Sequence, residues 1–209
     1  MPSVQPGLYA IVDLDACRAR ALEPLAVARA FCTAPLSALQ LRAKRATDRE
    51  RVGLARAVAA VARAAGIPFV VNDRADIARI AGADGVHLGQ DDLPPRAARR
   101  WLGPGCRIGL STHDLAQVDG AAGEPVDYLG FGPVFATSTK EHPSPVVGLD
   151  GLRAAVARSA HPIVAIGGIR LDDLPAVRAA GARAAALVSA LLEGDPAELA
   201  ARAARLFLG

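Results

Sequence analysis

Short apolar runs alternate with longer amphipathic stretches along the whole chain. Eight runs are bounded by Gly, Pro or polar residues and have the length of β-strands. The runs are Leu8–Val12, Ala38–Leu41, Pro68–Val71, Gly85–Leu88, Arg107–Leu110, Tyr128–Phe131, Ile163–Ile166 and Ala184–Val188. Because most of them are apolar on both faces, they suit a parallel sheet that is covered by helices.

The stretches between these runs carry helical signals. The clearest one begins at Thr47, with Glu50 three residues later at the spacing of a capping box, and ends before Gly66. Its apolar face is formed by Val52, Ala55, Val58, Ala59 and Ala62 at spacings of three and four. Further helices are predicted after Asp92, after His113, and from Leu149, Leu171 and Pro196, with C-terminal glycines at Gly66, Gly82 and Gly181.

Eight strands with intervening helices in 209 residues predict an α/β protein, a (β/α)8 TIM barrel that forms a single compact domain over residues 1–209. An open, doubly wound sheet is the alternative, because hydrophobic periodicity does not show whether a sheet closes. Hydrophobic residues make up 52% of the chain but aromatic residues only 4%, so Ala, Val, Leu and Ile must build the core.

Charge and cysteine usage narrow the class of partner. The net charge of +3 is dispersed, which favours small anionic ligands over nucleic acid. The one basic cluster, Arg96, Arg99 and Arg100 beside Trp101, is interpreted as a solvated helix face. The three cysteines lack zinc-ligand and CxxC spacing, and no signal peptide or membrane-spanning run is present, so a cytoplasmic protein with no membrane association is expected.

Lysine and asparagine are scarce in this arginine-rich chain. Lys44 and Lys140 are the only lysines among 24 basic residues, and Asn72 is the only asparagine. All three follow predicted strands, at the end of a barrel where loops carry function. A compact ammonium retained where arginine is otherwise used indicates a position that needs a point charge, and we interpret these residues as part of an anion site.

The segment after the second run contributes Gln40, Arg42 and Lys44 at alternate positions, so that all three project to one side if the strand continues. Two cations and an amide at a barrel mouth suit a phosphate or pyrophosphate. The alternative is an exposed loop that leads into the next helix.

Carboxylates follow the next two runs. Asp73 comes after the third run, and Asp91 and Asp92 come after the fourth. Neighbouring strands would bring Asp73 close to one of these acids, and Mg²⁺ is usually held by one or two carboxylates together with water and phosphate oxygens. The alternatives are a helix N-cap for Asp73 and a turn acid for Asp92, and spacing does not choose between Asp91 and Asp92.

The run GFGPVFATSTK is the most specific segment, with the hydroxyls of Thr137 and Thr139 followed by Lys140. The turn over residues 132–148 is predicted to be an ordered lid, or otherwise a structural loop. Farther along, the diglycine that ends in Gly168 and the residues Val188–Ala190 match the recurrent phosphate site of such barrels. Two phosphate sites in one mouth predict a reaction of two substrates.

Histidine chemistry is poorly supported by the sequence. His87 alternates with core residues, which places it in the barrel interior, and Ser111 and His113 show no readable nucleophile–base pairing. The GxGxxG fingerprint and the P-loop are both absent.

The ordered motifs YAIVD, LQLRAK, VND, ADGVHLGQDD, GLSTHD, YLGFGPVFATSTK, AIGGI and VSA resemble thiamine-phosphate synthase over nearly the whole chain. The resemblance implies a barrel transferase of thiamine biosynthesis that requires Mg²⁺. It would join 4-amino-2-methyl-5-hydroxymethylpyrimidine pyrophosphate to 4-methyl-5-(2-hydroxyethyl)thiazole phosphate, and release thiamine phosphate and pyrophosphate. A homodimer is a further expectation of the family.

The resemblance also implies residue roles. Arg42, Lys44, Asn72 and Lys140 would hold the pyrophosphate, Gln40 would line the same side, and Ser111 would bond to the pyrimidine or the leaving group. Asp73 and Asp92 would be the Mg²⁺ ligands. Thr137, Thr139, Gly168, Val188 and Ser189 would hold the thiazole phosphate.

Two other functions remain open on the sequence. One is a thiazole tautomerase-like barrel or another phosphate-binding barrel isomerase, and the other is a non-catalytic sensor of thiamine phosphates. One departure from the family pattern is visible, because GARAAALVSA lacks the aspartate–glycine pair often found before the eighth strand.

Overall fold

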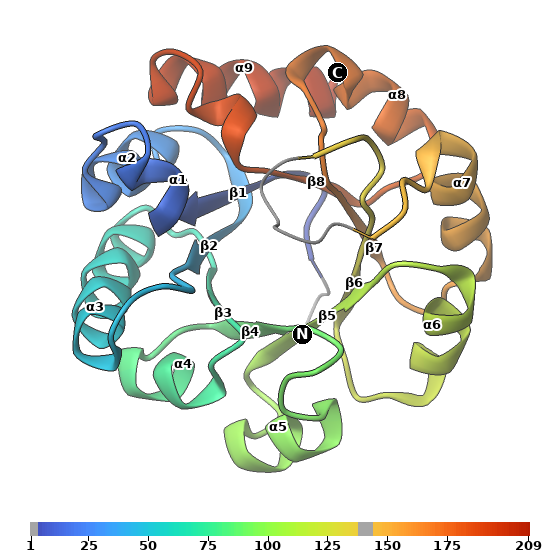
Figure 1. Ribbon diagram of the computed structural model, residues 1–209, viewed down its shortest axis with the longest axis horizontal. Coiled ribbons are helices and arrows are strands. Elements are labelled where there is room, and N and C mark those ends of the chain that lie inside the picture. Colours follow the sequence, from blue (N-terminus) through green and yellow to red (C-terminus); the bar gives the residue numbers. More distant parts are fainter. Residues whose placement is uncertain (1–3, 138–143) are drawn as a thin grey trace.

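The computed structural model describes residues 4–137 and 144–209, and it shows a closed barrel of eight parallel strands in sequence order (Figure 1). The strands are β1 (Gly7–Asp13), β2 (Leu36–Arg42), β3 (Phe69–Asn72), β4 (Gly85–Leu88), β5 (Arg107–Thr112), β6 (Tyr128–Phe131), β7 (Ile163–Ile166) and β8 (Ala184–Leu187). The pairing of β1 with β8, which sets Tyr9 opposite Ala186, closes the barrel. The predicted (β/α)8 fold is therefore confirmed, and the open sheet is wrong.

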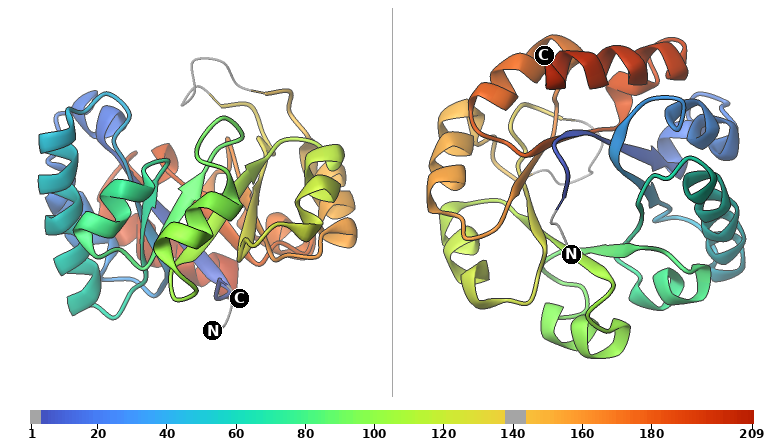
Figure 2. Two further views of the ribbon diagram at one scale, coloured as in Figure 1. Left: turned by 90° about the horizontal axis from the view of Figure 1, so that it is seen from below. Right: turned by 180° about the vertical axis from the view of Figure 1, so that it is seen from behind.

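Helices surround the barrel on its outer face (Figures 1 and 2). The α-helices are α1 (Leu14–Arg18), α2 (Pro24–Phe31), α3 (Asp48–Ala64), α4 (Ala75–Ala81), α5 (Pro95–Leu102), α6 (Leu115–Gly120), α7 (Gly148–Arg158), α8 (Leu174–Ala179) and α9 (Pro196–Leu208). Short 3-10 turns are η1 (Ala121–Gly123), η2 (Leu171–Asp173) and η3 (Ser189–Leu191). The predicted helices are present, although the one predicted from Leu171 starts as the 3-10 turn η2 and becomes the α-helix α8 only at Leu174. Helices α1 and α2 were not predicted, and α4 was indicated only by the glycine at its C-terminal end, Gly82.

The longest helix, α3, begins as its sequence predicts. The Thr47 hydroxyl accepts a hydrogen bond from the Glu50 backbone N–H at 3.3 Å, which satisfies one of the unpaired N–H groups of the first turn. The Glu50 carboxylate pairs with Arg18 at 2.5 Å instead of reaching back to Thr47. The helix ends at Ala64 and is followed closely by Gly66, whose φ of +69° is a left-handed conformation that glycine adopts without strain.

Two apolar layers hold the fold together. The larger one lies between the strands and the helices, and the smaller one fills the barrel interior. The interior layer consists of Val4, Tyr9, Ile11, Ala38, Val70, Tyr128, Val164, Ala184 and Ala186. Above them the inward positions become polar, so that the carboxyl ends of the strands form a polar mouth.

In the part of the chain that the structure describes, no helix has both the length and the apolar character needed to cross a membrane.

Candidate active site

The first charged pair of the mouth lies between β1 and β2. Asp13 and Arg42 are register partners at the last positions of these strands, and the Asp13 carboxylate forms a short ion pair with the Arg42 guanidinium. The Asp13 side chain is almost fully buried, and its other oxygen accepts from the Ala16 N–H at 2.8 Å at the start of α1. Arg42 is therefore held in a fixed orientation at the rim.

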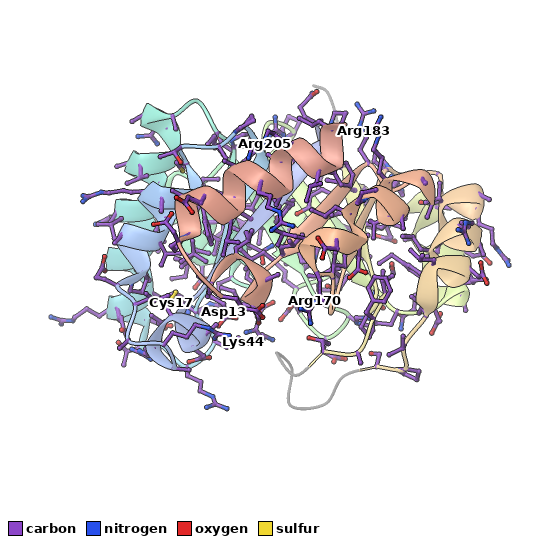
Figure 3. The ribbon with its side chains drawn as sticks, turned by 90° about the horizontal axis from the view of Figure 1, so that it is seen from above. Asp13, Cys17, Lys44, Arg170, Arg183 and Arg205 are labelled. Carbon is purple, nitrogen blue, oxygen red and sulfur yellow. The ribbon has the colours of Figure 1, made fainter. Side chains whose placement is uncertain are left out.

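Lys44 lies two residues farther along, in the loop between β2 and α3. Its Nζ is 3.3 Å from the Asp73 Oδ2 at the end of β3. The loop is fastened by Arg51 of α3, whose guanidinium donates to the carbonyls of Ala43, Lys44 and Ala46 at 3.0 to 3.2 Å. Arg42 and Lys44 are thus both brought to the mouth, as predicted. Figure 3 shows Asp13 and Lys44 at the same end of the barrel.

Asp73 and Asp92 lie next to each other. Burial raises the pKa of the Asp73 carboxyl above its usual range, Lys44 opposes this rise, and the neighbouring Asp92 adds to it. Asp73 holds a left-handed backbone with φ of +63°, and its N–H donates to the His87 carbonyl at 2.7 Å. In proteins, Mg²⁺ is usually held by one or two carboxylates together with water and phosphate oxygens.

The structure also shows which local contacts these acids make. Asp73 does not cap α4, because the N-cap residue is Arg74. Asp92 does close a turn, since its Oδ2 accepts from the Gly89 N–H at 2.6 Å. Asp91 is exposed, whereas Asp92 is half-buried beside Asp73. The pair brought together is therefore Asp73 and Asp92. Among the described residues, no group of three or more His, Cys, Asp or Glu side chains is arranged so that it could hold a metal ion.

The remaining residues of the predicted pyrimidine side point into the barrel. Asn72 is the register partner of His87 at the ends of β3 and β4. Ser111 Oγ lies 2.9 Å from the His87 Nε2, and Gln40 Nε2 donates to the Tyr9 hydroxyl at 2.9 Å. The prediction that His87 belongs to the barrel interior is confirmed by these contacts.

The candidate thiazole-phosphate side lies across the mouth. The segment after β6 runs beside β7, with the Phe135 N–H donating to the Gly167 carbonyl at 2.9 Å. Gly168 has φ of +66°, and a Cβ there would lie 2.3 Å from the Ala136 carbonyl oxygen, so only glycine fits between the two loops. Thr137 follows Ala136 directly in the sequence. Thr139 and Lys140 lie outside the described residues.

The end of β8 completes this side. Val188 immediately precedes η3, which begins at Ser189, so this short turn starts at the same end of the barrel as Gly168. The two predicted phosphate sites therefore share one mouth, as far as their described residues define them.

Sequence reasoning did not assign a role to Asp13 or to Arg51. Asp13 was recognisable, because it is a lone charge directly after a buried strand, the same signal that indicated Asn72. Arg51 was not recognisable, since nothing in the sequence separates it from the other arginines of the helices. Arg170, two residues after Gly168, also lies at the end of the barrel that carries Asp13 and Lys44 (Figure 3).

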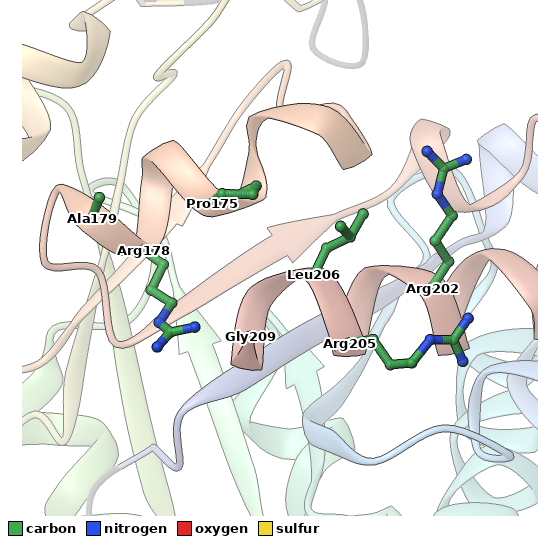
Figure 4. A pocket seen from close by; sticks show the side chains of 7 residues that line it. All are labelled: Pro175, Arg178, Ala179, Arg202, Arg205, Leu206 and Gly209. Carbon is green, nitrogen blue, oxygen red and sulfur yellow. The ribbon is translucent and has the colours of Figure 1, made fainter.

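A groove of about 710 Å³ lies elsewhere, between α8 and α9 (Figure 4). It is lined by Pro175, Arg178, Ala179, Arg202, Arg205, Leu206 and Gly209. These residues include the C-terminal turns of both helices, which lie at the end of the barrel away from the mouth because the helices run back against the strands. None of the predicted site residues lines this groove.

Comparisons with known proteins agree with this geometry. The family model described as thiamine monophosphate synthase matches residues 8–191. A thiamine-phosphate synthase from Chloroflexus aurantiacus is 41% identical over 198 residues, which cover 95% of this chain and 90% of that protein. One from Anaeromyxobacter dehalogenans is 43% identical over 197 residues, with 94% and 85% coverage.

Solved structures show the same relationship. A thiamine phosphate pyrophosphorylase from Pyrococcus furiosus superposes with a TM-score of 0.88 at 30% identity, over 98% of this chain and 96% of that one. A 3-hexulose-6-phosphate synthase, at 20% identity and a TM-score of 0.68 over 96% of this chain and 99% of that one, shares the fold alone. The family match spans the strands that carry the polar mouth, and the chain belongs to the thiamine monophosphate synthase family.

Proposed function

We propose that the chain is a transferase that condenses hydroxymethylpyrimidine pyrophosphate with hydroxyethylthiazole phosphate. The new bond joins the pyrimidine methylene carbon to the thiazole nitrogen, and the bond from that carbon to the pyrophosphate oxygen breaks. The products are thiamine phosphate and pyrophosphate.

The observation that carries the proposal is the convergence of Lys44, Asp73 and Asp92 at one edge of the mouth. A cation and two carboxylates from three consecutive βα loops suit a metal-bound pyrophosphate better than they suit a single phosphate group. A barrel that only isomerises a monophosphate would need no such group beside a second phosphate site.

Mg²⁺ fits these residues on their chemistry. Asp73 and Asp92 present hard oxygen ligands, and the burial that raises the Asp73 pKa makes their joint ionisation unfavourable without a cation. When bound there, Mg²⁺ would neutralise charge on the pyrophosphate oxygens.

The chain's own residues would then stabilise the departure of the leaving group. Arg42, held by Asp13, and Lys44, held by the loop that Arg51 fastens, place fixed positive charge where negative charge develops. Asn72 and Lys140 would complete the pyrophosphate site. Departure before much bonding to the thiazole nitrogen leaves a pyrimidine cation stabilised by its amino group, so no nucleophile or strong base is required.

Orientation of the second substrate would come from the opposite side of the mouth. Thr137, Thr139, Gly168, Val188 and Ser189 would hold the thiazole phosphate through hydroxyls and backbone N–H groups. Holding the thiazole nitrogen near the pyrimidine carbon converts a bimolecular step into an effectively unimolecular one.

The test is direct. Purified protein is incubated with both substrates and Mg²⁺, and thiamine phosphate is converted to fluorescent thiochrome. Product that depends on both substrates and disappears with EDTA supports the proposal. No product with or without Mg²⁺ would overturn it, and tight binding of thiamine phosphate without turnover would identify a sensor instead.

A further inference from the structure

A continuous chain of hydrogen bonds crosses the barrel interior below the mouth. It runs from Gln40 to the Tyr9 hydroxyl at 2.9 Å, from there to the Tyr128 hydroxyl at 2.9 Å, on to the His87 Nδ1 at 3.1 Å, and from the His87 Nε2 to the Ser111 Oγ at 2.9 Å. Its five members come from five different strands. Gln40 and Ser111 stand at its two ends.

The barrel interior leaves room for the side chains of this hydrogen-bond chain. The His87 and Tyr128 rings stack with centroids 5.5 Å apart and planes inclined by 29°. A Cβ at Gly109 would lie 2.2 Å from Tyr128 and 2.4 Å from the His87 Nδ1, and a Cβ at Gly130 would lie 3.0 Å from the His87 ring. Two glycines on β5 and β6 therefore leave the space that the stacked rings occupy.

Counting protons shows which group donates in each bond of this hydrogen-bond chain. The Gln40 amide donates to the Tyr9 oxygen. If each buried hydroxyl proton is to have an acceptor within this hydrogen-bond chain, Tyr9 donates to Tyr128 and Tyr128 donates to the His87 Nδ1. His87 must then carry its proton on Nε2 and donate to the Ser111 oxygen. The Ser111 hydroxyl proton is then left for a group outside the hydrogen-bond chain, as is the second amide proton of Gln40 at the other end.

We infer that Tyr9, Tyr128 and His87 form a positioning relay that holds Ser111 as a hydrogen-bond donor toward the mouth. The Ser111 proton is therefore offered to an acceptor of the substrate, such as a ring nitrogen or a phosphate oxygen. This last statement rests on the proposed function, whereas the direction of the relay does not. Burial raises the pKa of Tyr9 to about 12 and that of Tyr128 well above its usual range, so both remain phenols that donate.

The direction of proton donation through His87 can be tested without substrate, because it determines which ring nitrogen carries the proton. In protein labelled with ¹⁵N-histidine, the imidazole nitrogen shifts of His87 are identified by their loss in the His87→Asn variant. The expected result is a proton on Nε2 and none on Nδ1. A His87 that carries its proton on Nδ1 would overturn the inference.

Two tyrosine variants supply a matched comparison. Tyr128→Phe removes the donor to the His87 Nδ1, so the proton is expected to redistribute between the two ring nitrogens. Tyr9→Phe removes a hydroxyl that is equally buried but leaves Tyr128 free to donate to His87, so the ring is expected to keep its proton on Nε2. Equal redistribution in both variants, or in neither, contradicts the relay.

Activity gives a second readout. Tyr128→Phe should lower kcat/KM by about 3- to 10-fold, the scale of one neutral hydrogen bond, and should have no further effect in a Ser111→Ala background. Losses that simply multiply in the double variant would show that Tyr128 acts on its own. If the unmodified protein makes no thiamine phosphate, the proposed function fails while the nitrogen shifts still decide on the relay.

Discussion

The Lys44 Nζ and the Asp73 Oδ2 lie 3.3 Å apart, although the two residues belong to loops that follow different strands. The Lys44 side chain remains about half exposed, so the pair adds little to the stability of the fold. It does keep an ammonium beside the two carboxylates at the mouth. The pair therefore relates to the chemistry of the site more than to folding.

Lys44→Ala is expected to lower turnover by about 10²–10³-fold, the usual loss for one group that stabilises developing charge. The thermal unfolding midpoint should change little, because the Lys44 side chain is about half exposed. Arg49→Ala is the matched control, since Arg49 is an exposed cation on the first turn of α3. Thiochrome kinetics that are normal in Lys44→Ala would remove Lys44 from the proposed mechanism.

Asp91 and Asp92 provide a matched pair for the metal. Asp92→Asn should abolish most Mg²⁺-dependent turnover and weaken the stabilisation of the protein by Mg²⁺, because Asp92 lies beside Asp73. Asp91→Asn should leave both properties unchanged, because Asp91 is exposed. Titration of activity and of the unfolding midpoint with MgCl₂ measures both effects. The reverse pattern would assign the metal to Asp91.

Asp73→Asn is expected to stabilise the metal-free protein at neutral pH. The pKa of the Asp73 carboxyl is raised by burial, so its contribution favours folding only at low pH and is lost as the pH rises through the folded-state pKa. A neutral amide avoids that loss, and asparagine tolerates the left-handed φ of +63°. In EDTA, the variant should unfold at a higher temperature than the unmodified protein at pH 7.5, and the difference should shrink at pH 4.

The strands were predictable because their signal is local. β4, β6 and β7 have the predicted bounds, and the others differ by one or two residues at one or both ends. Helix α2 was missed because its N-cap is Glu23, a residue type that rarely caps, although Pro24 at its first position is a start signal. Local patterns of this kind specify elements and the end of the barrel at which a residue lies.

The contacts inside the site were not predictable in the same way. Tyr9 and Tyr128 are 119 positions apart, and their hydroxyls meet only because the register of the closed barrel brings both into the interior layer. Register between strands depends on packing across the whole barrel and is not encoded in either strand alone. The sequence could thus place His87 in the interior, but not identify its partners.

The Asp13–Arg42 pair makes an asymmetric prediction. Arg42→Ala leaves a buried carboxylate without its partner and should lower the free energy of unfolding by about 3–5 kcal/mol. Asp13→Asn should cost less, because the amide oxygen still accepts from the Ala16 N–H and Arg42 can reach water at the mouth. Its larger effect should be on turnover, through a guanidinium that is no longer oriented.

Urea unfolding and thiochrome kinetics on both variants check this asymmetry. Arg18→Ala is the control, since the Arg18–Glu50 pair is exposed and its loss should change the free energy of unfolding by less than about 1 kcal/mol. Equal stability losses in Arg42→Ala and Arg18→Ala would mean that the Asp13–Arg42 pair is not buried in solution.

Two glycine-to-alanine substitutions should have opposite signs. Gly53 lies inside α3, where an added Cβ meets nothing within 4 Å, so Gly53→Ala should stabilise the protein by about 0.5–1 kcal/mol through a less flexible unfolded chain. Gly109→Ala would push a methyl group within 2.4 Å of both Tyr128 and His87, and should destabilise by about 1–3 kcal/mol. Urea unfolding of the two variants measures both free energies. If Gly109→Ala is as stable as the unmodified protein, the stacked rings do not occupy the space that the glycine leaves.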